Sequence, residues 1–373
     1  MKSFLLLSII LIALGVTLLV NIAQAASQDG NTSLASDART SVATDARSPG
    51  ETCATACQSA SVIPTCCQWA PCTSFYADFL WLRPRNEGIE YAVPINGPIG
   101  TNQAPVVPVQ DGPTAIVDPN FSAGFRVGFD RAISDCGSIY GEYTYFRNTT
   151  SDSTSTSAPL VLRAMVLNPS TLDAAADWLN ANASSSTDFD LVDIGYHYNV
   201  WACNQNNLGL FAGVRYGHLN QQFQADYSNI VTDTVDAGVN FDGVGPRIGT
   251  DGNWCIGKGF FLHGKVSASF LGGEYSANYS DTSPTATSNP VAATSWHEAC
   301  LTSIIDGELG IGWETCSGRI RVMAGYSISD WCNVVKPSDF IAGVQANSYR
   351  AANQLGQTSL IFDGMMARAE INW

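Results

Sequence analysis

Apolar and polar residues alternate along much of the chain. In the clearest segment, 121–130, Phe125 and Phe129 share one face, while Arg126 and Asp130 take the other. Successive side chains of a strand point to opposite faces, so this pattern predicts a two-faced β-strand. The same period recurs at 208–217, 260–270, 301–313, 319–328 and 365–373.

The connections between these segments alternate in length. Short, Gly-, Asn-, Asp- or Ser-containing turns lie at 134–137, 203–207, 251–255 and 314–318, and long polar stretches at 85–119, 149–187, 228–240, 280–296 and 332–357. This asymmetry is typical of outer-membrane proteins and predicts an all-β fold, a transmembrane antiparallel up-and-down β-barrel of about ten strands. Both termini would lie on the periplasmic, short-turn side. The composition of 158–179 favours one short helix within a long outer loop.

A secreted soluble β-sandwich would alternate in the same way, because it also has one apolar and one polar face per strand. Two features favour the barrel. The polar face repeatedly carries Gly and charged residues, which suits a curved lumen, and aromatic residues gather near strand ends as in interfacial girdles. These are Trp81, Tyr143, Tyr145, Tyr196, Tyr198, Trp313 and Tyr326.

The N-terminal residues predict export. Lys2, an apolar run over 4–20 and Ala23-Gln24-Ala25 fit a cleaved signal peptide, 1–25. The alternative, a membrane anchor, is disfavoured because the run is short and no basic cluster follows it. Residues 26–73 are expected to be a disordered, Cys-rich periplasmic leader, and 74–373 the barrel, located in the cell outer membrane.

Charge and cysteine content narrow the function. With 33 acidic and 18 basic residues, the chain is not expected to bind nucleic acid. Eleven cysteines in an exported protein favour disulfides, and an odd count leaves one for another partner. A zinc site in the N-terminal cluster is the alternative, but paired spacing and a nearby His are missing; no metal is expected. The disulfide candidates are Cys53, Cys57, Cys66, Cys67, Cys72, Cys136, Cys203, Cys255 and Cys316.

The polar faces of the predicted strands define a lumen. Its charged residues are nearly balanced in sign and should pair across a narrow barrel, leaving either a small pore or a plug. His197 and His263 could neighbour carboxylates such as Asp193 or Asp306, but no nucleophile motif accompanies them, so no enzyme is expected. The segment 243–249 lacks the spacing of a dinucleotide loop. The predicted pore-lining residues are Asp78, Arg126, Asp130, Glu142, Asp193, His197, Arg215, Arg247, Asp251, His263, Lys265, Asp306, Glu308, Arg319, Arg321, Arg368 and Glu370.

Several segments carry a family resemblance: Ala77–Pro84, Gly88–Ala92, Phe241–Gly249 and the strand at 121–130. Over residues 74–373 the chain resembles the pore-forming outer-membrane protein family typified by the Legionella major outer-membrane protein, with relatives in chlamydia-like bacteria and planctomycetes. The resemblance implies a porin, often in cysteine-linked envelopes, without a cofactor and without catalytic residues.

Two functions follow from these observations. The first is a passive pore for small hydrophilic solutes or ions, with a mild cation preference from acidic loops at its mouth. The second is a structural or adhesive surface barrel with a sealed lumen, disulfide-linked to the envelope. Expected partners are outer-membrane lipid, the barrel-assembly machinery that reads the terminal Trp373, and disulfide-linked envelope proteins or a second copy.

Overall fold

The structure is a computed structural model, and it describes residues 73–97, 108–134, 136–171, 173–203, 206–284, 290–315, 317–346 and 358–373. The side chains of Ala175 and Cys203 lie outside that description. The predicted signal peptide, 1–25, and nearly all of the predicted leader, 26–73, also lie outside it, so both stay predictions.

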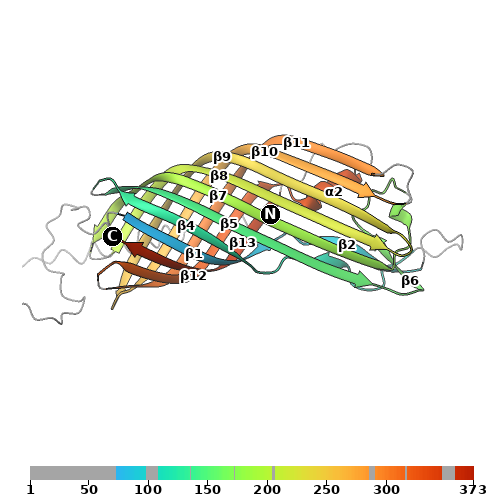
Figure 1. Ribbon diagram of the computed structural model, residues 1–373, viewed down its shortest axis with the longest axis horizontal. Coiled ribbons are helices and arrows are strands. Elements are labelled where there is room, and N and C mark those ends of the chain that lie inside the picture. The colour runs from blue at the N-terminus through green and yellow to red at the C-terminus, as the bar shows by residue number, and fades with distance from the viewer. Residues whose placement is uncertain are drawn as a thin grey trace, which may run out of the picture. The chain divides into compact units, whose positions relative to one another are not determined.

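Ten antiparallel strands form one closed barrel (Figure 1). Each pairs with the next barrel strand along the chain, and β1 pairs with β13 to close the ring. At this seam Thr73 and Trp373 exchange two backbone hydrogen bonds of 3.0 Å. The predicted number of strands and the strand predicted at 365–373 are confirmed, and the soluble sandwich is wrong. The barrel strands are β1 (Thr73–Arg85), β4 (Ser122–Ala132), β5 (Gly137–Ser155), β7 (Asn180–Cys203), β8 (Asn206–Ser228), β9 (Thr232–Gly257), β10 (Phe260–Thr282), β11 (Ala292–Glu314), β12 (Ile320–Val334) and β13 (Thr358–Asn372).

A belt of apolar side chains covers the outside of the barrel near its short-turn end. Phe125, Phe129, Leu210, Leu309 and Ile311 are each between 44% and 61% exposed. These residues belong to the apolar faces of the predicted strands, and they point away from the lumen. An apolar outer surface on a closed sheet is stable in hydrocarbon, because every strand finds its backbone partners within the barrel. We call the part of the barrel that carries this belt the membrane half.

The barrel continues beyond the belt as an open wall, here called the outer half. β11 pairs with β12 only over Ser303–Glu314, and β5 pairs with β4 only as far as Phe146. Past these points only β5 and β7 to β11 continue side by side, which makes a curved wall of six strands (Figure 1). By the usual topology of such barrels, the short turns face the periplasm and this wall faces outward.

The apolar face of a strand changes sides between the two halves. Along β8, Leu210, Val214 and Tyr216 face outward, whereas further on Phe223 and Tyr227 are buried on the inner face. Lipid surrounds only the membrane half. Beyond it, water bathes the outer surface, so apolar side chains are stable only on the inside.

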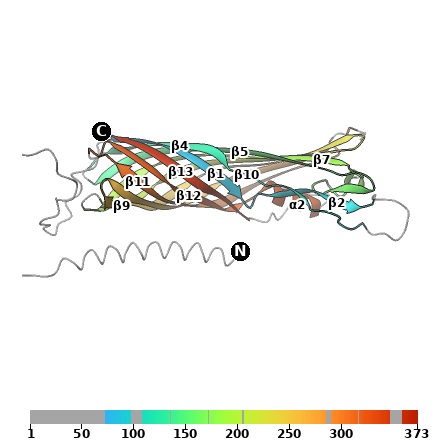
Figure 2. The same ribbon diagram turned by 90° about the horizontal axis from the view of Figure 1, so that it is seen from below.

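The inner surface of the outer half packs against a small second sheet and a helix (Figure 2). Tyr227 donates a hydrogen bond of 2.6 Å to the carbonyl of Tyr91, and Gln345 donates to the carbonyls of Met165 and Leu167. These contacts fix the inserted elements to the wall. The elements are β2 (Ile89–Asn96), β3 (Ala115–Val117), β6 (Leu160–Ala164) and α2 (Pro337–Ala346).

Three expectations about the connections are wrong. The residues predicted to be helical, 158–179, hold strand β6 and only a single 3-10 turn, η1 (Asp173–Ala175). The described α-helix lies instead within 332–357. The predicted turn at 251–255 belongs to β9, and the chain reverses at Gly257–Phe260. Much of 228–240, which was predicted to be a loop, belongs to β9, because the strands continue past the residues that face lipid.

No helix in the described part of the chain is long and apolar enough to cross a bilayer.

Candidate functional site: the charged layer of the lumen

The pairing of neighbouring strands brings inward-facing charges together in the membrane half. Asp78 on β1 lies directly opposite Arg368 on β13 and opposite Arg126 on β4. On the other side of the barrel, Asp193 on β7 lies opposite Arg215 on β8. Because side chains alternate along each strand, these residues share the inner face at one level of the barrel.

One group of ion pairs gathers around Asp78. Arg368 contacts both of its carboxylate oxygens at 2.7 Å, and Arg126 approaches one of them at 3.3 Å. Arg126 also bonds to Glu308, and Arg368 lies 3.7 Å from the same carboxylate. Arg126 is on β4 and Glu308 on β11, which do not pair. Their contact therefore crosses the lumen.

A second group gathers around Asp193. Arg215 binds this carboxylate with two hydrogen bonds of 2.7 and 2.9 Å, and it also reaches Asp306 at 2.7 Å. Arg247 bonds to Asp193 and lies 3.6 Å from Asp306. Planar guanidinium groups suit such shared carboxylates, because each offers several donors in a fixed geometry.

Glu142 on β5 joins the two groups. Its carboxylate lies 3.8 Å from Arg126, 3.4 Å from Arg247 and 3.3 Å from Lys265, and it accepts a hydrogen bond from Tyr76. The result is one connected set of ten charged side chains, which we call the charged layer. None of these side chains is more than 15% exposed. Its members are Asp78, Glu142, Asp193, Asp306, Glu308, Arg126, Arg215, Arg247, Lys265 and Arg368.

Two aromatic rings pack into the layer, and sequence patterning did not single them out. The Phe211 ring lies 5.4 Å from the Arg247 guanidinium and 5.6 Å from the Lys265 ammonium. The Tyr76 ring lies 4.5 Å from Arg368. Such cation–π contacts are favourable for charges removed from water. A Cβ at Gly249 would lie 2.4 Å from the Phe211 ring, so this glycine makes the packing feasible.

The other predicted pore-lining residues lie nearer the short-turn end. His197 and Asp251 are 2.8 Å apart, and Asp130 accepts a hydrogen bond from Ser138. His197 therefore neighbours a carboxylate as expected, but this is Asp251 and not Asp193 or Asp306. His263 bonds to Asn253 instead. Arg321 lies 3.3 Å from Glu314 and 3.4 Å from Glu370. Arg319 precedes β12 and is exposed at the barrel end.

An aromatic cluster lies on the outward side of the charged layer. The ring of Phe189 is 5.5 Å from Phe146, 4.7 Å from Phe362 and 5.7 Å from Trp331. All four rings are at most 2% exposed. Trp331 donates to the Ser329 hydroxyl, which in turn donates to Asp306. Ser329 thus links the two layers, and we call the four aromatic residues the aromatic layer.

Outward-facing tyrosines mark the upper border of the lipid belt. Tyr216 donates a hydrogen bond of 2.7 Å to Asp242, and Tyr143 donates to Asp190. Tyr326 donates to Asp363 in the same way. Amphipathic tyrosines with one end in hydrocarbon and a hydroxyl on a polar partner are typical of the membrane–water interface.

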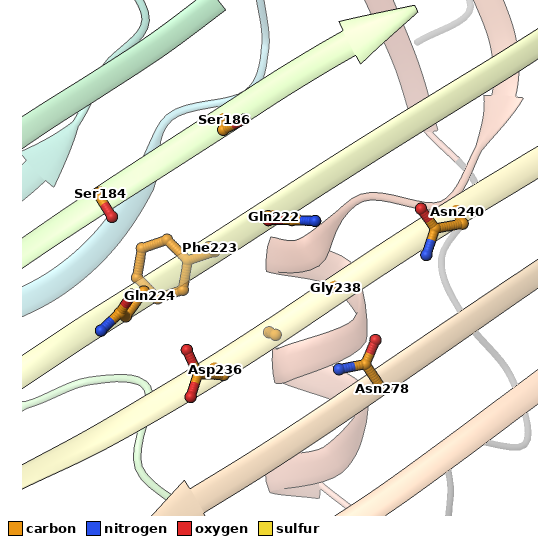
Figure 3. Close-up of a pocket in the computed structure, with 10 residues that line it drawn as sticks. Ser184, Ser186, Gln222, Phe223, Gln224, Asp236, Gly238, Asn240 and Asn278 are labelled. Carbon is orange, nitrogen blue, oxygen red and sulfur yellow. The ribbon is translucent and has the colours of Figure 1, made fainter.

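A polar pocket lies on the outer wall beyond this border (Figure 3). Its volume is about 260 Å³, and a Cβ at Gly238 would lie 2.7 Å from the Asn278 amide oxygen. Strands β7 to β10 supply hydroxyl and amide groups that can bond to water or to a hydrophilic ligand. The polar side chains are those of Ser184, Ser186, Gln222, Gln224, Asp236, Asn240 and Asn278.

The cysteines are only partly within the described chain. Cys136 is disulfide-bonded, and Cys332 carries a free thiol. Cys255 lies near the end of β9, where its backbone N–H donates to Asn206. Cys316 and the N-terminal cluster fall outside the described residues, so their disulfides stay predictions. No group of three or more His, Cys, Asp or Glu residues in the described ranges could hold a metal ion.

The comparison with family models decides the identity. Residues 67–370 match the family described as Legionella pneumophila major outer membrane protein precursor. The chain belongs to the Legionella major outer membrane protein family. The predicted resemblance is confirmed, and this family member is an outer-membrane β-barrel. A search of curated proteins gives no match.

Solved outer-membrane barrels are similar to this family member in a general way. The protease OmpT from Escherichia coli matches with a TM-score of 0.46 at 10% identity, over 81% of this chain and 96% of that chain. The Pseudomonas putida toluene transporter TodX gives 0.32 at 8% identity over 84% and 93%, and a Pseudomonas aeruginosa FadL homologue gives 0.23 at 8% over 80% and 90%. At these values the similarities say nothing of function.

Proposed function

We propose that this protein is a structural surface barrel whose lumen is sealed and which displays its outer half at the cell surface. The observation that carries the proposal is the charged layer, in which five acidic and five basic side chains contact one another across the membrane half. The aromatic layer then covers it. Water would have to pass first through paired charges and then through packed rings.

The size of the barrel supports the closure. Barrels of about eight strands have interiors just wide enough for side chains to fill, and wide aqueous channels need about sixteen or more. A ten-stranded barrel is near the small end. Opening the layer would separate buried charges from their partners, which is strongly unfavourable away from bulk water.

We also propose that the protein is not an enzyme. His197 and His263 are the histidines of the lumen, and their hydrogen-bond partners are Asp251 and Asn253. A nucleophile within hydrogen-bond reach of the histidine base would be required for acyl transfer. Neither histidine has a hydrogen bond to a serine, threonine or cysteine in the described structure. We therefore assign these residues to the polar network of the lumen.

The second candidate is the porin that the family resemblance implies. It is favoured by the polar groups on the short-turn side of the charged layer, such as the partly buried Asp130, Arg321 and Glu370. These residues form a polar vestibule. A pore would then require the charged layer to exchange partners and open wide enough to admit small sugars as well as ions.

Liposome swelling separates the two candidates. Vesicles containing the folded wild type should swell no faster in small sugars than empty vesicles. Glu142→Ala combined with Arg247→Ala removes a central acid and base together, and vesicles containing this variant should swell faster. Asp236→Asn, on the outer wall, is the matched control and should behave like the wild type. Rapid swelling with the wild type would support the porin instead.

A further inference from the structure

Two aspartates at the outermost ends of β9 and β10 differ from every carboxylate of the charged layer. Asp233 and Asp281 both lie on the inner face and are 0% exposed. Thr234 pairs with Thr282 and Val235 with Asp281, so the two aspartates are diagonal neighbours across one strand pair. Diagonal neighbours on one face lie about 7–8 Å apart. The charge of Asp233 acts on Asp281, so a cation held between them would interact with both carboxylates.

These carboxylates lack basic partners in the described structure. All four of their oxygens are buried, and the neutral groups that act on them are the Ser283 hydroxyl beside Asp233 and the Asn168 backbone beside Asp281. The described charged groups that act on the pair are themselves acidic, and include Asp173 of η1. In the charged layer, by contrast, every carboxylate contacts an arginine or lysine. An uncompensated buried carboxylate is strongly unfavourable.

Protonation relieves only part of this cost. Burial, together with Asp233, raises the pKa of the Asp281 carboxyl to about 6, and burial also raises the pKa of Asp233. A group with a pKa near 6 is mostly ionised at neutral pH. The outer end of the barrel therefore holds negative charge in a dry environment, where a cation would be strongly attracted.

We propose that Asp233 and Asp281 form a calcium site at the outer end of the barrel. The ligand chemistry fits a hard cation that prefers oxygen donors, and Ca²⁺ accepts irregular sets of carboxylate, hydroxyl, carbonyl and water oxygens. Two carboxylates supply the charge, and the Ser283 hydroxyl, which is hydrogen-bonded to Asp233, supplies a further oxygen. Water completes such a site, since no third carboxylate, His or Cys of the described residues is placed to bind the same ion.

The site would link the wall to the elements inserted into it. Asp281 faces the segment that carries Asn168, and Tyr279, two residues earlier on the same face, donates a hydrogen bond of 3.0 Å to the carbonyl of Val166. A bound ion would therefore fix the ends of β9 and β10 to the connection between β6 and η1. This role is independent of whether the lumen conducts.

Terbium luminescence tests the proposal in the full-length protein, folded in detergent and freed of metal with a chelator. Tb³⁺ replaces Ca²⁺ at oxygen sites, and Tyr279 lies close enough to sensitise its emission. We expect saturable emission that Ca²⁺ displaces. Asp233→Asn and Asp281→Asn should each weaken Tb³⁺ binding at least tenfold. Asp236→Asn, whose side chain faces outward on the same strand, should bind as the wild type does (Figure 3).

A second measurement guards against variants that misfold. Ca²⁺ should raise the melting temperature of the wild type and of Asp236→Asn, but not that of the double variant Asp233→Asn with Asp281→Asn. The double variant should also melt no lower than the chelated wild type, because its buried charges are gone. Absence of Ca²⁺ stabilisation in the wild type, or emission undiminished in the two Asn variants, would overturn the proposal.

Discussion

Arg215 shows how strongly single residues of the charged layer depend on one another. It binds Asp193 through two hydrogen bonds and Asp306 through a third, and its side chain is 3% exposed. Arg215→Ala would leave two buried carboxylates short of a partner. We expect a loss of about 3–5 kcal/mol in the free energy of unfolding, measured by urea denaturation in lipid vesicles.

The matched control for Arg215 is Arg83, which pairs with the largely exposed Asp118. Exposed pairs contribute about 0–1 kcal/mol, so Arg83→Ala should have little effect. Equal losses from the two variants would contradict the buried, interdependent network.

Glu87 gives a pH-dependent prediction at the residue scale. It lies between β1 and β2, is buried, and accepts a hydrogen bond from Thr187. Burial raises its pKa from 4.5 to about 8, against the opposing influence of Lys336. The folded state therefore keeps a proton that the unfolded chain releases above about pH 4.3, and stability falls as the pH rises from there to about 8.

Glu87→Gln should remove this pH dependence. The wild type should lose up to about 1.4 kcal/mol per pH unit relative to Glu87→Gln between pH 5.5 and 7.5, as measured by urea unfolding. Glu90→Gln, an exposed position on β2, should keep the wild-type slope. A wild-type slope that persists in Glu87→Gln would assign the titration to another group.

At the scale of elements, the reversal of the apolar face along β8 can be tested with one substitution at three positions. Val214→Arg places a charge on the lipid-facing surface and should cost about 2–4 kcal/mol. Gln222→Arg adds the same charge to the exposed outer wall and should be nearly neutral. Phe223→Arg buries a charge in the outer core and should prevent folding, seen as loss of heat-modifiable gel migration. A large loss of stability in Gln222→Arg would indicate that lipid, and not water, surrounds this part of the wall.

The same reversal explains which elements could be predicted from sequence. Where one face meets lipid, as at Phe125 and Leu309, the alternation predicts both the strand and its orientation. In the outer half, residues such as Val235 and Asp236 keep the alternation with the opposite sense, so the pattern there predicts a polar loop where the structure has strand. The sequence does not predict the α2 helix, because it is only ten residues long and packs against strands that are distant along the chain.

The sequence predicts which charged residues face the lumen, but not which of them form ion pairs. Alternation placed Asp78, Arg126 and Glu308 in the lumen, but their pairing depends on how the barrel closes and how its strands are staggered. The stagger of the strands cannot be derived from the alternation of residues along the sequence. For the same reason the sequence does not indicate that Asp251 is the partner of His197 or that Asn253 is the partner of His263. Tyr76 and Phe211 were not singled out because aromatic residues on an inner face have no charge to mark them.

For the whole molecule, the distribution of charge is uneven. The full chain carries 18 basic and 33 acidic residues, and removing the five of each sign in the charged layer leaves 13 and 28. The net charge of −15 therefore lies entirely outside the layer. An acidic exterior attracts cations, whereas a balanced lumen has no net charge to select them.

Planar-bilayer recording of the folded wild-type protein in potassium chloride tests the sealed lumen most directly. We expect no stable conductance steps from the wild type, and we expect ion leakage from Glu142→Ala combined with Arg247→Ala under the same conditions. Uniform, long-lived open steps from the wild type would contradict the account, because they would require a continuous water path through the charged and aromatic layers.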